Sequence, residues 1–186
     1  MAIAGTTTNG VSTSSAELPS SAKLPLCWYA VYTCSNREKK VAAEILQRGI
    51  ESYLPTYRTA RRWSDRRIEL EMPLFQSYLF VHLDLSERLK VLQVHGVVRL
   101  VGIGGLPTPL PDEQIENLRA GLAQKLRAEP HSFLTAGRQV RIKRGPLAGM
   151  TGILLRRKGQ LRVVISIALI QRAVAIDADE ADVEPV

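Results

Sequence analysis

The chain has 186 residues, of which 45% are hydrophobic and 23% charged, so it is long enough for one domain or two small ones. The longest candidate for a membrane segment, 163–170, has only the length of a strand, and the sequence therefore predicts no membrane-spanning helix. The net charge of +7 favours a polyanionic neighbour such as nucleic acid, although an excess of this size also occurs in proteins that merely stay soluble.

The first 26 residues are rich in Ser, Thr, Ala and Pro. They lack the basic start and apolar core of a secretory signal, so we interpret 1–26 as a disordered tail. The two cysteines, Cys27 and Cys34, have no second pair nearby, which suits neither a zinc site nor a disulfide framework. We expect two reduced thiols in a cytoplasmic protein with no metal and no cofactor.

The best-marked helix of the chain follows an aromatic and β-branched strand at 28–33. Ser35 and Glu38 have the Ser-x-x-Glu spacing of a capping box, and Gly49 supplies a stop. The apolar residues between these signals fall on one helical face: Val41, Ala42, Ile45 and Leu46.

Three further strands are predicted at 50–57, 68–74 and 78–83. The arginine-rich stretch 58–67 connects the first two of these strands. This order predicts an exposed basic hairpin.

A short helix is predicted after Ser86, which is placed to cap it, with Leu89 and Leu92 pointing inward. A strand at 97–101 and a loop rich in Gly and Pro at 102–110 follow. Pro111 suits the first turn of a last helix. Its inward-facing residues follow helical spacing: Ile115, Leu118, Leu122 and Leu126.

This order of elements predicts an α+β fold, an antiparallel sheet of about four strands with helices packed on it, over 27–128. Residues 129–137 have little periodicity and are interpreted as a linker. From residue 138 the pattern changes to short strands, and 138–186 has the size of a small all-β barrel. The predicted strands are 139–143, 151–157, 161–167 and 172–176.

Residues 140–154 resemble a KOW motif, which forms part of an SH3-like barrel. Val140 and Ile142 point inward from a strand, and Gly145-Pro146 turns the chain. Gly149 and Gly152 then permit special backbone geometry or close packing. A generic two-stranded hairpin is the alternative interpretation.

Three segments of the front half resemble the amino-terminal domain of the NusG family, namely 28–33, 73–81 and 105–110. With the KOW segment, the resemblance covers about residues 27–186. It implies a transcription elongation and antitermination factor whose front domain docks on the β′ clamp helices of RNA polymerase. We expect a monomer with a tethered KOW domain.

Phe75, Tyr78 and Phe80 occupy the segment that forms the apolar docking surface in this family. Tyr78 and Phe80 share one strand face because they are two residues apart. The resemblance therefore implies that these three residues bind polymerase. Ordinary core packing is the alternative.

Candidate nucleic-acid-binding residues lie in two places. Arginines interleaved with an indole can hold phosphates while the ring stacks on an unpaired base, and a solvated hairpin is the alternative interpretation. The residues of this stretch are Arg61, Arg62, Trp63, Arg66 and Arg67, with Arg58 before them. The resemblance also implies that Arg37 and Lys40, at the start of the first helix, face the non-template DNA strand.

Two departures from the family pattern favour a specialised antiterminator of the UpxY or RfaH type, which acts on particular operons. Gln76-Ser77 replaces Pro-Gly before the tyrosine, and Ala168-Leu169-Ile170 replaces Phe-Gly-Arg after Ser166-Ile167. The altered loop puts recruitment of Rho or of a ribosomal protein in doubt. Leu147 and Met150 remain apolar candidates for a partner surface on the KOW domain.

Two other classes compete with this interpretation. A KOW-containing ribosomal or RNA-binding assembly protein explains the barrel and the charge but leaves the 75–81 segment unexplained. An enzyme is disfavoured because the histidines are scattered, no phosphate-binding glycine motif follows a strand, and no nucleophile has a base partner. We therefore expect a binding protein without catalytic activity.

Overall fold

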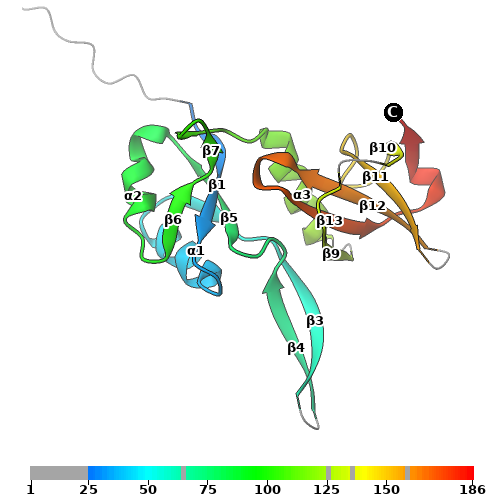
Figure 1. Cartoon of the computed structure of the whole chain (residues 1–186), viewed down its shortest axis with the longest axis horizontal. Helices are drawn as coiled ribbons and strands as arrows, with labels where there is room; N and C mark the ends of the chain where they lie inside the picture. Colours follow the sequence, from blue (N-terminus) through cyan, green and yellow to red (C-terminus); the bar gives the residue numbers. More distant parts are fainter. Residues whose placement is uncertain (1–24, 64–65, 125–126, 135–136, 158–159) are drawn as a thin grey trace, which may run out of the picture.

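The computed structural model describes the chain from residue 25 onward, apart from 64–65, 125–126, 135–136 and 158–159 (Figure 1). The tail predicted at 1–26 therefore falls almost wholly outside the described residues. None of the helices in the described part is long and apolar enough to cross a membrane.

A four-stranded antiparallel sheet, which we call the front sheet, organises the first half of the chain in the order β2-β5-β1-β6. Its central strands pair from Cys27 with Leu83 to Tyr32 with Tyr78. Its strands are β1 (Cys27–Thr33), β2 (Glu51–Tyr53), β5 (Tyr78–Leu83) and β6 (Val97–Leu100). The prediction of a sheet of about four antiparallel strands is confirmed.

Alternate side chains of the front sheet enter two different cores, as the period of two in a strand requires. Tyr29 and Val31 face the core that includes Val41 and Ile45 of helix α1 (Glu38–Gln47). The other face, with Trp28 and Ala30 among its residues, enters a larger core that extends into the rear half of the chain. The front sheet is therefore buried on both faces.

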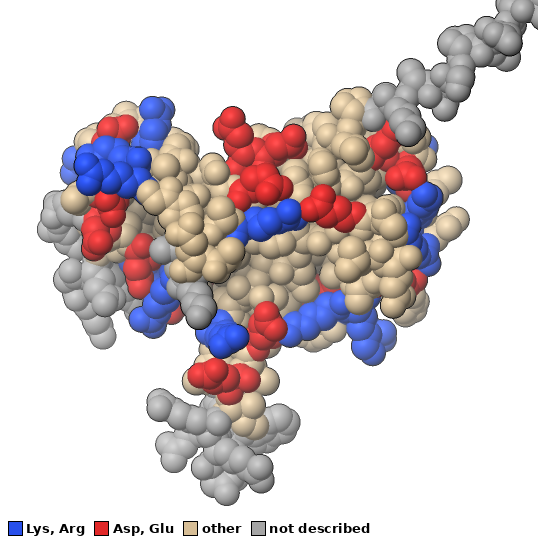
Figure 2. Space-filling model, turned by 180° about the vertical axis from the view of Figure 1, so that it is seen from behind, with Lys and Arg blue, Asp and Glu red and all other residues tan. Residues whose placement is uncertain are grey.

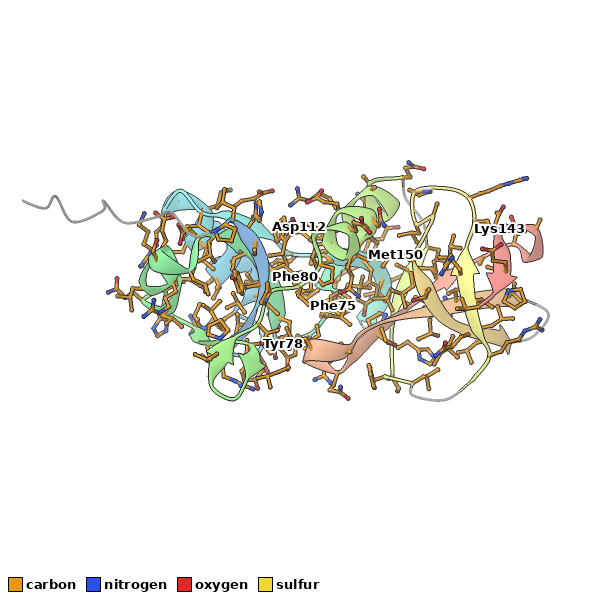
Figure 3. The ribbon with its side chains drawn as sticks, turned by 90° about the horizontal axis from the view of Figure 1, so that it is seen from above. Phe75, Tyr78, Phe80, Asp112, Lys143 and Met150 are labelled. Atoms are coloured by element: carbon orange, nitrogen blue, oxygen red, sulfur yellow. The ribbon has the colours of Figure 1, made fainter. Side chains whose placement is uncertain are left out.

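Helix α3 (Asp112–Ala123) contributes to this larger core through Ile115 and Leu118, and Pro111 stands immediately before it. Leu122 is partly buried, whereas Leu126 lies outside the described residues. The same core includes residues of the second half such as Val163. Helix α3 thus packs between the front sheet and the second half (Figures 1 and 3).

The short helix α2 (Arg88–Leu92) differs from its prediction. Leu89 and Leu92 are 57% and 38% exposed, so the expectation that they point inward is wrong. Ser86 does not cap the helix: it lies in a 3-10 turn (Leu85–Glu87) that precedes α2, and this turn is capped by the Asp84 carboxylate, which accepts from Ser86 N–H. This shift in register buries Val91 and Val94 instead.

The arginine-rich stretch forms the ends of two paired strands, β3 (Thr56–Trp63) and β4 (Arg66–Pro73), which project from the body (Figure 1). The predicted strand 50–57 is interrupted at Pro55, whose carbonyl accepts from Leu74 N–H at the base of the hairpin. A second, smaller hairpin joins β7 (Gly102–Ile103) to β8 (Leu106–Pro107) within the predicted loop.

The second half forms a six-stranded antiparallel sheet, the rear sheet, in the order β14-β10-β11-β12-β13-β9. Four strands match their predictions to within one residue at each end: β10 (Gln139–Ile142), β11 (Thr151–Arg157), β12 (Gln160–Ile167) and β13 (Arg172–Asp177). β14 (Val183–Pro185) completes one edge. This sheet is compatible with the predicted barrel, and the α+β class is confirmed.

The residues interpreted as a linker begin in regular structure. β9 (Ala128–His131) pairs with β13 and forms the other edge of the rear sheet. Pro130 opposes Val174 on this strand. A proline, which cannot donate to a neighbouring strand, is tolerated at a sheet edge, and this explains why the residue did not prevent strand formation.

The KOW segment depends on one close approach between β11 and β12. A methyl group at Gly152 would lie 2.6 Å from both Val163 Cγ1 and Val164 O. We expect Gly152→Ala to lower the free energy of unfolding by about 2 kcal/mol, the usual cost of overpacking. Urea unfolding measures the change, with Thr151→Ala on the exposed neighbouring residue as control. Equal stability of the two variants would contradict this packing.

Candidate functional site

The candidate docking residues are held by a tight turn that leads into β5. Tyr78 N–H donates to Phe75 O at 3.0 Å, and Ser77 has φ +66°, the left-handed conformation. Gln76 has no positive φ, so the turn is of type II, which prefers glycine at the position of Ser77. A non-glycine residue in this conformation costs roughly 1 kcal/mol or more.

Aromatic rings gather around this turn and form what we call the aromatic cluster. Phe75 and Phe80 meet edge to face with ring centroids 5.8 Å apart, and Tyr53 stacks on Phe80 at 6.4 Å. Tyr32 and Tyr78 lie 5.2 Å apart on neighbouring strands. The cluster therefore comprises Tyr32, Tyr53, Phe75, Tyr78 and Phe80.

The cluster is mostly covered. Phe75 is 1% exposed and Phe80 is fully buried, whereas Tyr78 is partly exposed. Figure 3 shows Phe75 and Phe80 on the side of the front half that faces the rear sheet. The expectation of an accessible apolar surface is therefore not met in this arrangement, because sequence alternation places these rings on one face but does not say what covers that face.

The candidate partner residues of the KOW segment are covered as well. Leu147 and Met150 are 3% and 8% exposed and belong to the same core as Phe75 and Phe80. In Figure 3 Met150 lies on the side of the rear half that faces α3. The predicted partner surface of the front half and that of the rear half are thus both buried in one shared core.

Few polar contacts among the described residues join the two halves. Gln114 Nε2 donates to Ser166 O at 3.4 Å, and the Arg172 guanidinium lies 5.7 Å above the ring of Tyr78. The Ser166 hydroxyl is buried without a hydrogen-bond partner among the described residues. The association of the halves therefore depends mainly on apolar burial.

Arg119 fixes α3 on the front sheet. Its guanidinium lies 5.0 Å from the Trp28 ring and 4.9 Å from the Tyr53 ring, and its Nη2 donates to Glu51 Oε1 at 2.9 Å. Burial raises the pKa of the Glu51 carboxyl, but the hydrogen bonds and charges of Arg119 and His82 outweigh burial and leave that pKa lowered. Sequence reasoning missed this cluster because its members come from four separate elements.

The candidate nucleic-acid-binding residues lie apart from the aromatic cluster. Arg37 and Lys40 are exposed at the start of α1. The side chains of Arg61, Arg62, Trp63, Arg66 and Arg67 lie outside the described residues, although their backbones pair at the far end of the β3–β4 hairpin. Seen from behind, the described Lys and Arg side chains are interspersed with Asp and Glu (Figure 2).

The predicted capping box of α1 does not form. Arg37 is the N-cap residue and no side chain caps the helix. The Ser35 hydroxyl instead lies 3.0 Å from the Ser77 hydroxyl, and Glu38 Oε1 accepts from Ser77 N–H at 2.8 Å. Ser35 and Glu38, the two residues of the predicted box, thus both contact Ser77 in the turn, about forty residues further along the chain.

Within the parts of the chain that the structure describes, no group of three or more His, Cys, Asp or Glu side chains is placed to hold a metal ion. The described residues form a mixed α+β architecture with an aromatic turn in the front half and a six-stranded antiparallel sheet in the rear half.

Comparison with known proteins places this architecture in a family. The NusG family model, described as "Transcription termination factor nusG", matches residues 26–119. This match spans half of the chain and includes the front sheet and the first part of α3. The chain belongs to the NusG family.

Curated relatives extend the similarity into the rear half. The Thermus thermophilus protein named transcription termination/antitermination protein NusG is 28% identical over 163 residues, covering 75% of this chain and 89% of its own length. A Rickettsia felis protein of the same name is 25% identical over 165 residues, with 81% and 86% covered. A solved structure of Thermotoga maritima NusG shares the fold, with a TM-score of 0.57, 23% identity, and 87% and 98% covered.

Tyr53 supplies a test of the buried cluster. Burial raises the pKa of its phenol to about 12, and its hydroxyl has no hydrogen-bond partner among the described residues. Unfolded chains ionise tyrosine near pH 10, so the contribution of Tyr53 to stability is complete below pH 10 and is lost as pH rises toward 12.

We therefore expect Tyr53→Phe to be as stable as the parent at pH 8, or more stable by up to about 1 kcal/mol, because an unpaired hydroxyl is removed. Between pH 10 and 12 the variant loses less stability than the parent. Urea unfolding at pH 8 and at a pH between 10 and 12 measures this difference, and Tyr57→Phe is the matched control. An identical pH dependence in parent and Tyr53→Phe would contradict the burial of this phenol.

Proposed function

We propose that this chain docks on RNA polymerase through the aromatic cluster and keeps transcription processive. Membership of the NusG family makes it a transcription elongation and antitermination factor, because its relatives carry the name transcription termination/antitermination protein over most of their length. The alternative, a KOW-containing ribosomal or RNA-binding assembly protein, leaves the aromatic turn without a role. The proposal assigns no catalytic step to any residue.

The docking surface consists of Phe75, Tyr78 and Phe80, and its partner is the pair of β′ clamp helices. The single observation that supports it is a hydrogen-bonded turn at the segment that resembles the family's docking surface. This turn sets Phe75 against Phe80, and Tyr78 lies on the same strand face as Phe80. Large aromatic side chains on a fixed backbone make effective interface anchors because little conformational entropy is lost on binding.

Docking requires the two halves to separate as domains, because Phe75 and Phe80 are buried against the shared core. Separation breaks few directional contacts, principally Gln114 with Ser166 and Arg172 with Tyr78. In this proposal the chain between β9 and β10 connects the separated halves. Tyr78, which is already partly exposed, is the first anchor available to the polymerase.

The docking proposal predicts a loss of polymerase binding without a loss of fold in Tyr78→Ala. We expect its affinity for RNA polymerase to fall about tenfold, since one aromatic anchor is removed. Pull-down of polymerase and in vitro transcription through a pause and a terminator measure binding and read-through. Leu46→Ala, an exposed apolar residue on α1, is the control. Read-through equal to that of the parent in Tyr78→Ala would defeat the assignment.

The separation of the halves has its own prediction. The double variant Gln114→Ala, Arg172→Ala removes both named polar contacts between the halves and leaves the aromatic cluster intact. We expect it to bind polymerase about threefold or more tightly, because a larger fraction of molecules is open. If this variant binds more weakly than the parent, the closed arrangement is not what limits docking.

We also propose that the protein contacts single-stranded DNA near the polymerase. Arg37 and Lys40 are exposed on α1 and face the non-template strand in this proposal. The projecting hairpin supplies a second set of contacts, with its arginines on phosphates and Trp63 on an unpaired base. Their support is the exposed position of α1 and the concentration of arginine at the hairpin's far end.

Replacing the four arginines of the hairpin's far end by alanine tests this interaction. We expect the variant to bind single-stranded DNA more weakly and with a shallower salt dependence, by about 0.7 in the log–log slope for each phosphate that is no longer neutralised. Fluorescence anisotropy at several salt concentrations measures the slope. The control replaces Arg138 and Arg141, two exposed arginines of the rear half. The same slope in both variants would remove the hairpin from the interface.

A specialised, operon-specific role is the finer part of the proposal. It is supported by Gln76-Ser77 and by Ala168-Leu169-Ile170, the two places where the chain departs from the family pattern. Leu147 and Met150 become a partner surface for a ribosomal protein or Rho only after the halves separate, since both are buried in the shared core.

A further inference from the structure

Glu38, the first residue of α1, carries a carboxyl group that is buried rather than exposed on the helix surface. Its side chain is 3% exposed, and it forms no ion pair among the described residues. One oxygen of its carboxylate accepts from the backbone N–H of Ser77 at 2.8 Å. Burying a carboxylate is unfavourable unless it is hydrogen-bonded, so this contact is one that the fold depends on.

Glu38 accepts a hydrogen bond from the N–H of Ser77, a group that has no partner inside the turn. A type II turn between Phe75 and Tyr78 uses the N–H of Tyr78, so the N–H of Ser77 has no partner within the turn. Because this group is buried with the residue, it needs an acceptor from elsewhere. The first residue of α1 provides it.

Two further contacts hold the same residue from the same side. Thr33 N–H donates to Ser77 O at 2.9 Å, and the Ser35 and Ser77 hydroxyls lie 3.0 Å apart. Ser77 is therefore fixed through its N–H, its carbonyl and its side chain by the segment that joins β1 to α1. Glycine adopts the left-handed conformation freely, whereas serine needs such support.

We propose that Glu38 is a positioning residue for the docking surface. By accepting from Ser77 N–H it holds a non-glycine residue in the left-handed conformation, and so sets the directions in which Phe75 and Tyr78 project on either side of the turn. The carboxylate replaces the conformational freedom that glycine supplies in related turns. This inference rests on the proposed docking of the aromatic cluster on polymerase.

The site of the charge agrees with this role. Glu38 is the first residue of α1, a helix of ten residues, and the positive end of the helix dipole lies at this end. The helix terminus stabilises the carboxylate, and the carboxylate orients the turn. The aromatic cluster is thus positioned by α1, an element that does not itself contribute a ring.

The test is a double-mutant cycle in the full chain with RNA polymerase binding as the readout. We expect Glu38→Ala to weaken binding about tenfold, as loss of an interface anchor does. Ser77→Gly alone leaves binding at the parent level. The double variant recovers to within about threefold of the parent, because glycine adopts the turn without the carboxylate.

Two variants separate positioning from a merely structural role. Glu38→Gln keeps an oxygen acceptor for Ser77 N–H and is expected to retain binding. Glu38→Asp keeps the charge, but its shorter side chain does not reach Ser77, so it weakens binding and is recovered by Ser77→Gly in the same way. If Glu38→Ala does not fold, Glu38→Asp with and without Ser77→Gly tests the positioning role in its place. Glu44→Ala, which loses an ion pair with Arg48 on the same helix, is the control and binds like the parent.

Parent-level binding by both Glu38→Ala and Glu38→Asp overturns the inference, and so does a failure of Ser77→Gly to recover the loss. Failure of the docking proposal looks different, because then Tyr78→Ala and the parent bind polymerase equally or neither binds. In that case amide hydrogen exchange at Ser77, expected to speed up in Glu38→Ala and not in Glu44→Ala, tests the positioning contact without polymerase.

Discussion

Burial of the aromatic face of the front sheet is the constraint on which the rest of this structure depends. Trp28, Phe75 and Phe80 form a surface too apolar to remain in water at little cost, and α3 and the rear half cover it. The same rings are the chain's best anchors for a protein partner. In the docking that we propose, a partner therefore competes with closure of the halves for one surface, and few polar contacts among the described residues hold the halves closed.

Features of the fold that depend on short stretches of sequence were predictable. Strands β10 to β13 were placed to within one residue, because alternating apolar residues between turn residues are a short-range signal. The α+β class and the family followed from segments whose order and spacing are visible along the chain. The predicted inward face of α2 is wrong because Ser86 lies in a 3-10 turn, so that α2 begins only at Arg88 and buries Val91.

The site was less predictable because its contacts are distant in sequence. The spacing of Tyr78 and Phe80 gave their shared face, but residues more than sixty positions later cover that face. Ser35 and Glu38 matched a local capping pattern, yet both side chains contact Ser77. A single sequence shows which side chains can form hydrogen bonds. It does not show whether such a side chain bonds to a neighbour along the chain or to a distant residue.

The two departures from the family pattern lie beside residues that join the halves. Ser77 immediately precedes Tyr78, and the 3-10 turn Ala168–Ile170 separates Ser166 from Arg172, the two rear-half residues that contact Gln114 and Tyr78. Ile170 is buried in the shared core. Substitutions confined to such a contact change how readily the halves part while leaving each half's own core intact. The proposed specialisation would therefore act on how readily partners reach the proposed docking surface, while the rings of that surface stay aromatic.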